Sequence, residues 1–340
     1  MRQKIILIFL LVTLSIFSQQ ENVHIKGNKN ITYLGYIIEM GDPSSNDKTH
    51  PIYKIIYQFP SNKNNKTLFK LFELASDIDY STLVNLMYYL PEFPLDDDFK
   101  MSDKLKTYLG FNSDKNKNTL QEILEELNTY YKESNFETIW QQLQPEIDKI
   151  QSDLKDYLPE NKLINQMEEF YQQSYESYYV LPIITLWQAG FAIRDFEKNK
   201  SIFVLGPLQK NYGFKGETQF IDLTIHEFGH TFVNHIVLNH KDEIDKTKHL
   251  FTDISIDMKK QGYTNWETCV LEHFVRAGEV IIRENVGNQK QSEYLLNQYS
   301  KERNFKYLSF IVNKLKYYRI DKKLDYDKAV LNTLKDLSKN

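Results

Sequence analysis

Apolar residues recur at helical spacing along most of the chain from about residue 68 onward. A period near 3.6 residues places such residues on one face of an amphipathic helix. Pro145 falls inside the pattern at 136–157 and is expected to kink or divide that helix. The patterns predict helices over 68–75, 81–90, 118–133, 136–157, 160–178, 241–260, 289–318 and 326–337.

Shorter runs rich in β-branched and aromatic residues predict strands. Residues 31–38 and 52–59 flank the turn-rich segment 41–47, and we expect a small hairpin or sheet edge there. The fold class that follows from both patterns is α+β, mostly helical with a small β-sheet. Further strands are expected at 180–187, 191–196 and 201–208.

The first 20 residues have the pattern of a secretory signal peptide. Arg2 and Lys4 precede an apolar run that ends at Phe17, and this run is too short to favour a membrane-spanning helix. We expect cleavage near Ser18 and export to the periplasm or the exterior, with no stable membrane insertion afterwards. An uncleaved N-terminal anchor is the alternative.

The chain is expected to contain two regions after its first 18 residues, and the second is expected to form one compact unit with the helices that precede it. Residues 1–18 are the signal peptide, 19–178 a β-hairpin and helical region, and 179–340 the region that carries the candidate chemistry. The formal net charge is −4 without a block of basic residues, so nucleic acid is not expected as a partner. The single cysteine, Cys269, excludes an intramolecular disulfide and a multi-cysteine zinc site. The oligomeric state stays open.

The candidate chemistry lies in the motif His226-Glu-Phe-Gly-His230. Two histidines four residues apart on a helix share one face, so both imidazoles can bind a single Zn²⁺. The glutamate between them, Glu227, can then reach a water activated by that ion. In a chain of this composition the motif arises by chance at a frequency on the order of 0.01. We therefore predict a zinc site with Glu227 as the general base.

The surroundings of the motif strengthen this interpretation. Apolar residues cover most sides of the predicted helix and leave one polar stripe of Asp222, His226, His230 and Asn234, each four residues from the next. Buried polar groups without partners are costly, and a metal ion would satisfy the stripe. Gly229 costs about 1 kcal/mol relative to Ala inside a helix, which indicates close approach of another backbone or a ligand. The alternative is a core helix whose histidines bond to neighbouring side chains.

A catalytic zinc ion usually takes a third protein ligand. A histidine six residues after the motif is excluded because position 236 is Ile, and position 233 is Val where that pattern requires Gly. A glutamate on a later helix is the remaining common solution, and Glu272 is our first choice because it lies in an apolar setting where a carboxylate needs a partner. Its alternative role is an intrahelical pair with Arg276.

Other residues near Glu272 stay open as the third ligand. Glu279 and His273 are two of them. Glu267 is the third, although its spacing from Thr264 is that of a capping box at the start of a helix.

These motifs resemble those of the gluzincins, the thermolysin-like branch of the zinc metallopeptidases. The run from His226 to Asn234, with the later Glu272-His-Phe-Val-Arg-Ala277, is more closely similar to a family of exported bacterial proteins known as a domain of unknown function and suspected to be peptidases. The resemblance covers roughly residues 200–285 and implies zinc bound by His226, His230 and Glu272, with Glu227 as the base. The thermolysin type has an aspartate four residues after its glutamate ligand, where this chain has Arg276, so the tuning of the site does not carry over.

The function expected from these residues is hydrolysis of peptide or protein substrates by a zinc metallopeptidase. An edge strand of the small sheet is expected to border the zinc cleft and to pair with an extended peptide. Tyr212 is a candidate to stabilise the oxyanion, and Arg276 to orient Glu272 or to bind developing negative charge.

Two rival functions stay open. One is metal-dependent hydrolysis of a non-peptide amide or ester. The other is a non-catalytic secreted binding protein whose metal site is structural, which four protein ligands would favour. His235 is a poor fourth ligand because it is turned about 100° from the polar stripe.

Overall fold

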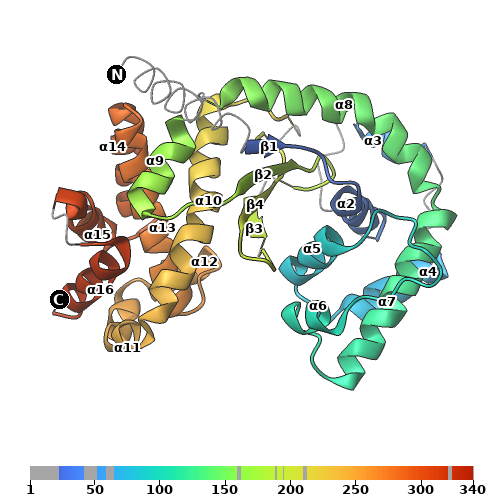
Figure 1. Ribbon diagram of the computed structural model, residues 1–340, viewed down its shortest axis with the longest axis horizontal. Coiled ribbons are helices and arrows are strands. Elements are labelled where there is room, and N and C mark those ends of the chain that lie inside the picture. The colour runs from blue at the N-terminus through green and yellow to red at the C-terminus, as the bar shows by residue number, and fades with distance from the viewer. Residues whose placement is uncertain are drawn as a thin grey trace, which may run out of the picture. The chain divides into compact units, whose positions relative to one another are not determined.

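The computed structural model describes residues 23–41, 52–58, 65–158, 162–187, 190–193, 195–209, 213–320 and 324–339. These residues are mostly helical and contain one four-stranded sheet, so the predicted α+β class is confirmed (Figure 1). The strands are β1 (Val23–Ile25), β2 (Ser177–Pro182), β3 (Gly190–Ile193) and β4 (Lys200–Leu205). The helices are α2 (Lys29–Gly41), α3 (Ile52–Ile56), α4 (Lys66–Ala75), α5 (Tyr80–Tyr89), α6 (Asp103–Tyr108), α7 (Asp114–Glu133), α8 (Phe136–Tyr157), α9 (Lys162–Tyr171), α10 (Glu217–Asn239), α11 (Lys241–Lys246), α12 (Ser255–Lys260), α13 (Trp266–Asn285), α14 (Gln289–Asn297), α15 (Leu308–Leu315) and α16 (Tyr326–Leu337).

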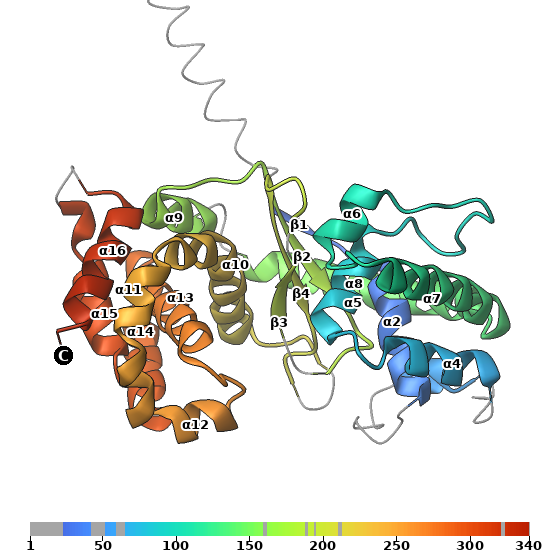
Figure 2. The same cartoon turned by 90° about the horizontal axis from the view of Figure 1, so that it is seen from below.

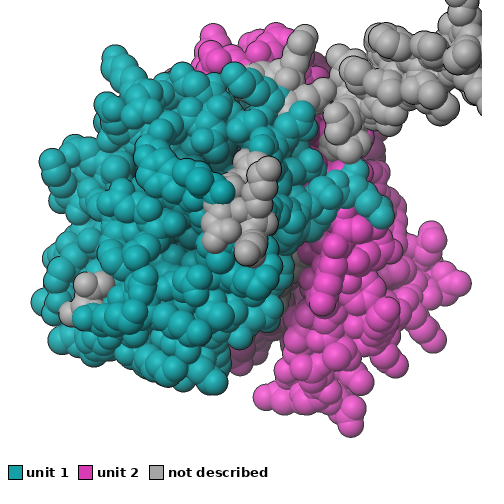
Figure 3. Space-filling model, turned by 60° about the vertical axis from the view of Figure 1, so that its left-hand side comes forward, with its two compact units in different colours: residues 1–22, 158–176, 218–340 teal, residues 23–157, 177–217 magenta. Residues whose placement is uncertain are grey.

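The chain forms two compact units, which Figure 3 colours separately. Of the described residues, the sheet unit comprises those within 23–157 and 177–217, and the helical unit comprises those within 158–176 and 218–340. This grouping does not follow the order of the chain. The reason is that β2 pairs with β1 from the N-terminal region, whereas α9 packs against α13 from the C-terminal region.

The sheet has the strand order β1-β2-β4-β3. β1 and β2 are parallel, β2 and β4 are parallel, and β3 is antiparallel to β4. The predicted strands near 180–187, 191–196 and 201–208 are confirmed with shifted ends. Five of the six residues of β4 are buried, which is typical of a strand covered on both faces. The expectation that an edge strand borders a metal cleft stays a prediction.

The hairpin predicted from 31–38 and 52–59 is wrong, because these runs form helices α2 and α3. The Asn28 side chain accepts a hydrogen bond from the backbone N–H of Ile31 at 2.9 Å, which caps the start of α2. Nearly every residue of α2 is buried, so its β-branched residues pack on all sides of a helix. Tertiary packing has therefore overridden the local β preference.

The helices predicted in the middle of the chain are confirmed. α4, α5, α7 and α8 match their patterns, and α8 continues through Pro145. The pattern at 160–178 is helical only to Tyr171, after which the chain enters β2. The pattern at 241–260 is divided into α11, a 3-10 turn and α12.

The centre of the helical unit is α13, which packs against α9, α14 and α15 (Figures 1 and 2). A Cβ atom at Gly278 would lie 2.0 Å from the Tyr171 hydroxyl, and one at Gly229 of α10 would lie 3.3 Å from a methyl of Val275. The close approach expected at Gly229 is thus made by side chains of α9 and α13. The two glycines let these helices come together.

Two earlier expectations lie outside the described residues: the signal peptide at 1–18 and the candidate Tyr212. The same holds for most of the turn-rich segment 41–47. No helix in the part of the chain that the structure describes is long and apolar enough to cross a membrane.

Candidate metal centre

The motif residues lie in the middle of α10, inside the helical unit. The ring centroids of His226 and His230 are 4.9 Å apart with the rings nearly perpendicular, and both side chains are half-buried. Glu227 between them is 5% exposed. The helix therefore presents two imidazoles on one face, as their spacing predicts.

Glu272 of α13 lies directly opposite the two histidines. Its Oε1 is 3.3 Å from Nε2 of His230, and its Oε2 is 3.7 Å from Nε2 of His226. One ligand atom from each of the three residues lies within 4.8 Å of the others. Zinc bonds of about 2.0–2.2 Å at tetrahedral angles separate neighbouring ligand atoms by about 3.3–3.6 Å. The cluster therefore fits a divalent cation with two nitrogen ligands and one oxygen ligand.

The second nitrogen of each histidine faces a different partner. Nδ1 of His230 lies 3.2 Å from Oδ1 of Asn234, and Nδ1 of His226 lies 3.4 Å from Oε2 of Glu279, just short of hydrogen-bond geometry. Glu279 is 1% exposed and accepts the hydroxyl of Tyr299 at 2.9 Å. Acceptors beside Nδ1 favour a proton there and leave Nε2 free for a metal.

Arg276 and Tyr263 hold Glu272 from the other side. Arg276 Nη2 lies 3.2 Å from Oε2 of Glu272 and donates to the Tyr263 hydroxyl at 3.1 Å, while that hydroxyl donates to the same Oε2 at 3.2 Å. The guanidinium is buried over the rings of Tyr299 and Phe305. Arg276 is thus placed to orient Glu272, the first of the two roles expected for it.

The charges of the cluster shift one another's pKa values. Burial acts to lower the pKa of His230, but the hydrogen bond and charge of Glu272 outweigh burial and raise that pKa to about 9. Burial acts to raise the pKa of Glu272, and the two histidines overcome it and hold that pKa far below its usual range. A metal must displace the proton on His230, so its affinity is expected to fall as the pH falls.

Glu227 has a pKa that is shifted in the opposite direction to that of Glu272. Burial raises its pKa above the usual range, and the charges of His226, His230 and Glu272 all act on it. A carboxylate whose pKa is raised in this way takes up a proton more readily than an exposed glutamate does.

The other candidates for the third ligand are placed elsewhere. Glu279 contacts His226 on the side away from Glu272, and His273 points into an aromatic cluster of Trp266, Phe305 and Tyr307. Glu267 is half-buried in the first turn of α13. That helix is capped by Asn265, whose side chain accepts from Thr268 N at 2.9 Å, so the capping box expected from Thr264 is wrong.

Replacing Glu279 with Gln is expected to weaken metal binding about 10–100-fold, the usual cost of removing a group that supports a metal ligand. The carboxylate beside Nδ1 of His226 would become a neutral amide. A competition titration with a chromophoric chelator measures the change. Glu284→Gln on the same helix is the control and should leave affinity unchanged. Equal affinity in Glu279→Gln and the wild type would remove Glu279 from the site.

His273→Phe is expected to reduce the loss of stability in acid. Burial lowers the pKa of His273 to about 4, against about 6.5 in the unfolded chain. As the pH falls below about 6.5 the unfolded chain takes up the proton first, so the stability present above that pH is lost progressively down to about pH 4. At pH 5 the loss amounts to about 2 kcal/mol.

Urea unfolding at about pH 7 and about pH 5, with a chelator present, tests this expectation. The wild type should lose more stability between the two conditions than His273→Phe does. The control is His249→Phe at an exposed histidine, which should behave as the wild type. An unchanged pH dependence in His273→Phe would contradict the assignment.

The ends of the polar stripe have protein partners. Asp222 pairs with Arg283 of α13 at 2.5 Å and accepts from Gln291 at 2.7 Å. Burial raises the pKa of Asp222 to about 6. The stripe therefore contributes its two histidines to the cluster, while Asp222 links α10 to α13.

The sequence interpretation missed two supporting residues, Tyr263 and Tyr299. Tyr263 lies in the loop between α12 and α13, and Tyr299 follows α14, so neither lies on the two helices that carry the motifs. For Glu279 a signal was present, because it lies seven residues after Glu272 and thus on the same face of α13.

The comparisons with known proteins give one match. No curated protein and no solved structure matches this chain. A family model described as "Domain of unknown function (DUF4932)" matches residues 97–328, which include α10 and α13 and thus His226, His230 and Glu272. Because the match spans more than half of the chain, the protein belongs to this DUF4932 family.

Proposed function

We propose that this protein is a zinc-dependent metallopeptidase that cleaves peptide bonds. The observation that supports this proposal most is the convergence of His226, His230 and Glu272, with Glu227 buried on the same helix. Within the described residues this cluster supplies three ligands, which leaves a coordination position for water or substrate. A bound divalent cation would supply Lewis-acid polarisation of a carbonyl and activation of water.

Residues of the chain would carry out proton transfer and would position the ligands. Glu227 would take the proton from the attacking water and then deliver it to the leaving amine. Arg276 and Tyr263 would fix Glu272, so that Oε1 faces His230. We keep Tyr212 as a candidate for stabilising the oxyanion, to be tested by Tyr212→Phe.

The proposed substrate is a peptide or protein outside the cytoplasm. The signal-peptide pattern of the first 20 residues supports export, and the net charge of −4 argues against nucleic acid. The periplasm or the exterior of a bacterial cell is the compartment that fits the export pattern.

The test combines metal analysis with an unbiased digest. The purified chain should contain about one zinc ion and should cleave members of a peptide library, with activity lost to a chelator and restored by Zn²⁺. Small amides and esters are assayed in parallel. If the chain hydrolysed these compounds but no peptide, it would be an amidase or an esterase and not a peptidase. Bound zinc without hydrolysis of any probe would favour a structural metal in a binding protein.

A further inference from the structure

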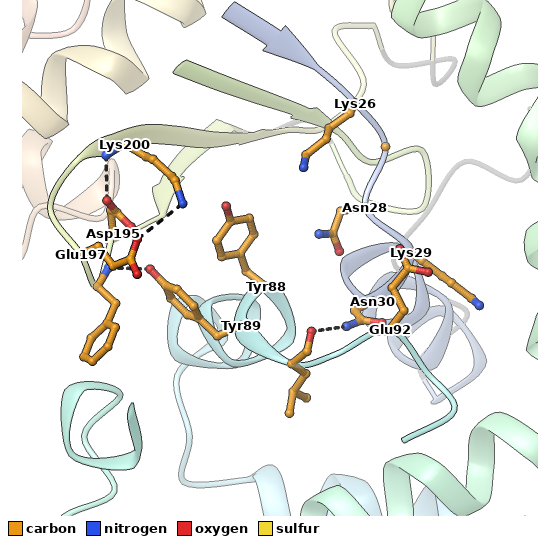
Figure 4. Close-up of a pocket in the computed structure, with 13 residues that line it drawn as sticks. Lys26, Asn28, Lys29, Asn30, Tyr88, Tyr89, Glu92, Asp195, Glu197 and Lys200 are labelled. Atoms are coloured by element: carbon orange, nitrogen blue, oxygen red, sulfur yellow. Dashed lines mark hydrogen bonds and ion pairs between the residues drawn. The ribbon is translucent and has the colours of Figure 1, made fainter. Parts of the chain in front are cut away.

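The sheet unit contains a cavity of about 480 Å³, shown in Figure 4. Its walls come from three segments that are distant in sequence: the loop from β1 into α2, the end of α5, and the β3–β4 connection up to Lys200. Small-molecule sites usually have volumes of about 300–1,000 Å³. The size of the cavity therefore suits a small ligand.

Hydrogen-bond donors converge on this cavity. Figure 4 shows the polar ends of Lys26, Asn28, Tyr88 and Lys200 turned toward the same space. Among the described residues no carboxylate pairs with Lys26, whose Nζ lies 4.8 Å from the ring centroid of Tyr179. The ammonium of Lys200 has only a distant partner, Glu197 at 3.7 Å. The ammonium of Lys26 is thus available to a ligand, whereas that of Lys200 is already paired with Glu197.

The other two donors are the side-chain amide of Asn28 and the hydroxyl of Tyr88. The Oδ1 atom of Asn28 is used by the cap of α2, where it accepts from Ile31 N, so its amide nitrogen is the group left for the cavity. Burial raises the pKa of Tyr88 to about 12, so its hydroxyl keeps its proton at neutral pH and can donate.

The wall also carries acceptors. Asp195 accepts two backbone N–H groups, from Asn199 and Lys200, at 2.7 Å each, which fixes its carboxylate in the β3–β4 connection. Glu92 and Glu197 are exposed at the rim. A bare inorganic anion would use the donors and face these carboxylates without a partner. A ligand that also carries hydroxyl groups can donate to them.

We propose that this cavity binds an acidic sugar, a hydroxyl-rich ring whose carboxylate lies among Lys26, Asn28 and Tyr88. Its hydroxyl groups donate to the carboxylates of the rim, and the ring of Tyr88 covers part of an apolar sugar face. The site is independent of the proposed peptidase chemistry, since none of its residues belongs to the metal cluster.

Calorimetric titration of the full chain with four probes tests the ligand class. Glucuronate is expected to bind at least about tenfold more tightly than glucose, the effect of one charge-assisted hydrogen bond. It should also bind more tightly than sulfate or glycylglycine, which lack the hydroxyl-rich ring. If glucose bound as tightly as glucuronate, recognition of the carboxylate would be overturned. If sulfate or glycylglycine bound as tightly as glucuronate, the ligand would not be a sugar. If glucuronate did not bind, the whole proposal would be overturned.

Point variants then test the location of the site. Asn28→Asp keeps a side chain that caps α2 but replaces the amide donor with a carboxylate, so glucuronate affinity should fall at least about tenfold without a change in melting temperature. Lys26→Met at an exposed position should give a similar loss. The control is Lys54→Met, an exposed lysine of α3 outside the cavity, which should bind as the wild type. Wild-type affinity in both Asn28→Asp and Lys26→Met would overturn the assignment to this cavity.

Discussion

Glu227→Gln is expected to lower the turnover of peptide hydrolysis by about 10²–10⁴-fold, the usual contribution of general acid–base catalysis. Gln has nearly the shape of Glu but cannot accept a proton at neutral pH. Glu227 is 5% exposed and is not one of the three residues that converge as ligands. Metal content should therefore stay at the wild-type value while activity falls.

The measurement is a pair of assays on the same preparations: zinc by elemental analysis, and initial rates on the best peptide found in the library digest. Glu217→Gln is the control, because Glu217 is an exposed glutamate at the start of the same helix α10. It should keep both metal and rate. Full activity in Glu227→Gln would remove Glu227 from the mechanism, whereas loss of zinc would show that it supports the ligands.

The core of the site could be predicted because its geometry is local. Residues His226 and His230 meet on one face of any helix that contains them, so their spacing was sufficient. Glu272 could be singled out because a carboxylate in an apolar helix needs a partner. The structure brings Glu272 into the cluster and places His273 and Glu279 outside it. Which of these three residues faces the histidines depends on how α13 is rotated about its axis, and the sequence does not specify this rotation.

The supporting contacts could not be predicted because they depend on tertiary packing. Tyr263 reaches Glu272 from a loop, and Tyr299 reaches Glu279 from the turn after α14. Neither contact leaves a periodic signal in the sequence. Acceptor groups nevertheless lie beside Nδ1 of both histidines, which is the usual arrangement around histidines that can bind a metal.

The fold shows the same contrast between local and tertiary information. The amphipathic helices α7, α8 and α16 were predictable because one polar face marks their period. Helix α2 lacks such a face, since almost all of it is buried, and its β-branched residues imitate a strand. A run that is apolar on every side does not distinguish a buried helix from a buried strand.

Glu272→Ala is expected to lower zinc affinity by more than about 100-fold, beyond the cost of removing a residue that only supports a ligand. Two histidines would remain for the ion. The same change leaves Arg276 buried without its carboxylate, and breaking a buried pair in this way costs about 3–5 kcal/mol of stability. Loss of metal in this variant alone could therefore follow from local unfolding.

The double variant Glu272→Ala with Arg276→Met separates the two effects. It removes both charges, so most of the stability should return, because well-packed apolar residues often replace a buried ion pair without loss. If Glu272 is a ligand, zinc affinity stays low in the refolded double variant. If Glu272 serves only as the partner of Arg276, affinity recovers together with stability. Chelator competition and urea unfolding on the wild type, both single variants and the double variant form a complete cycle, and the affinity of the double variant decides between the two roles of Glu272.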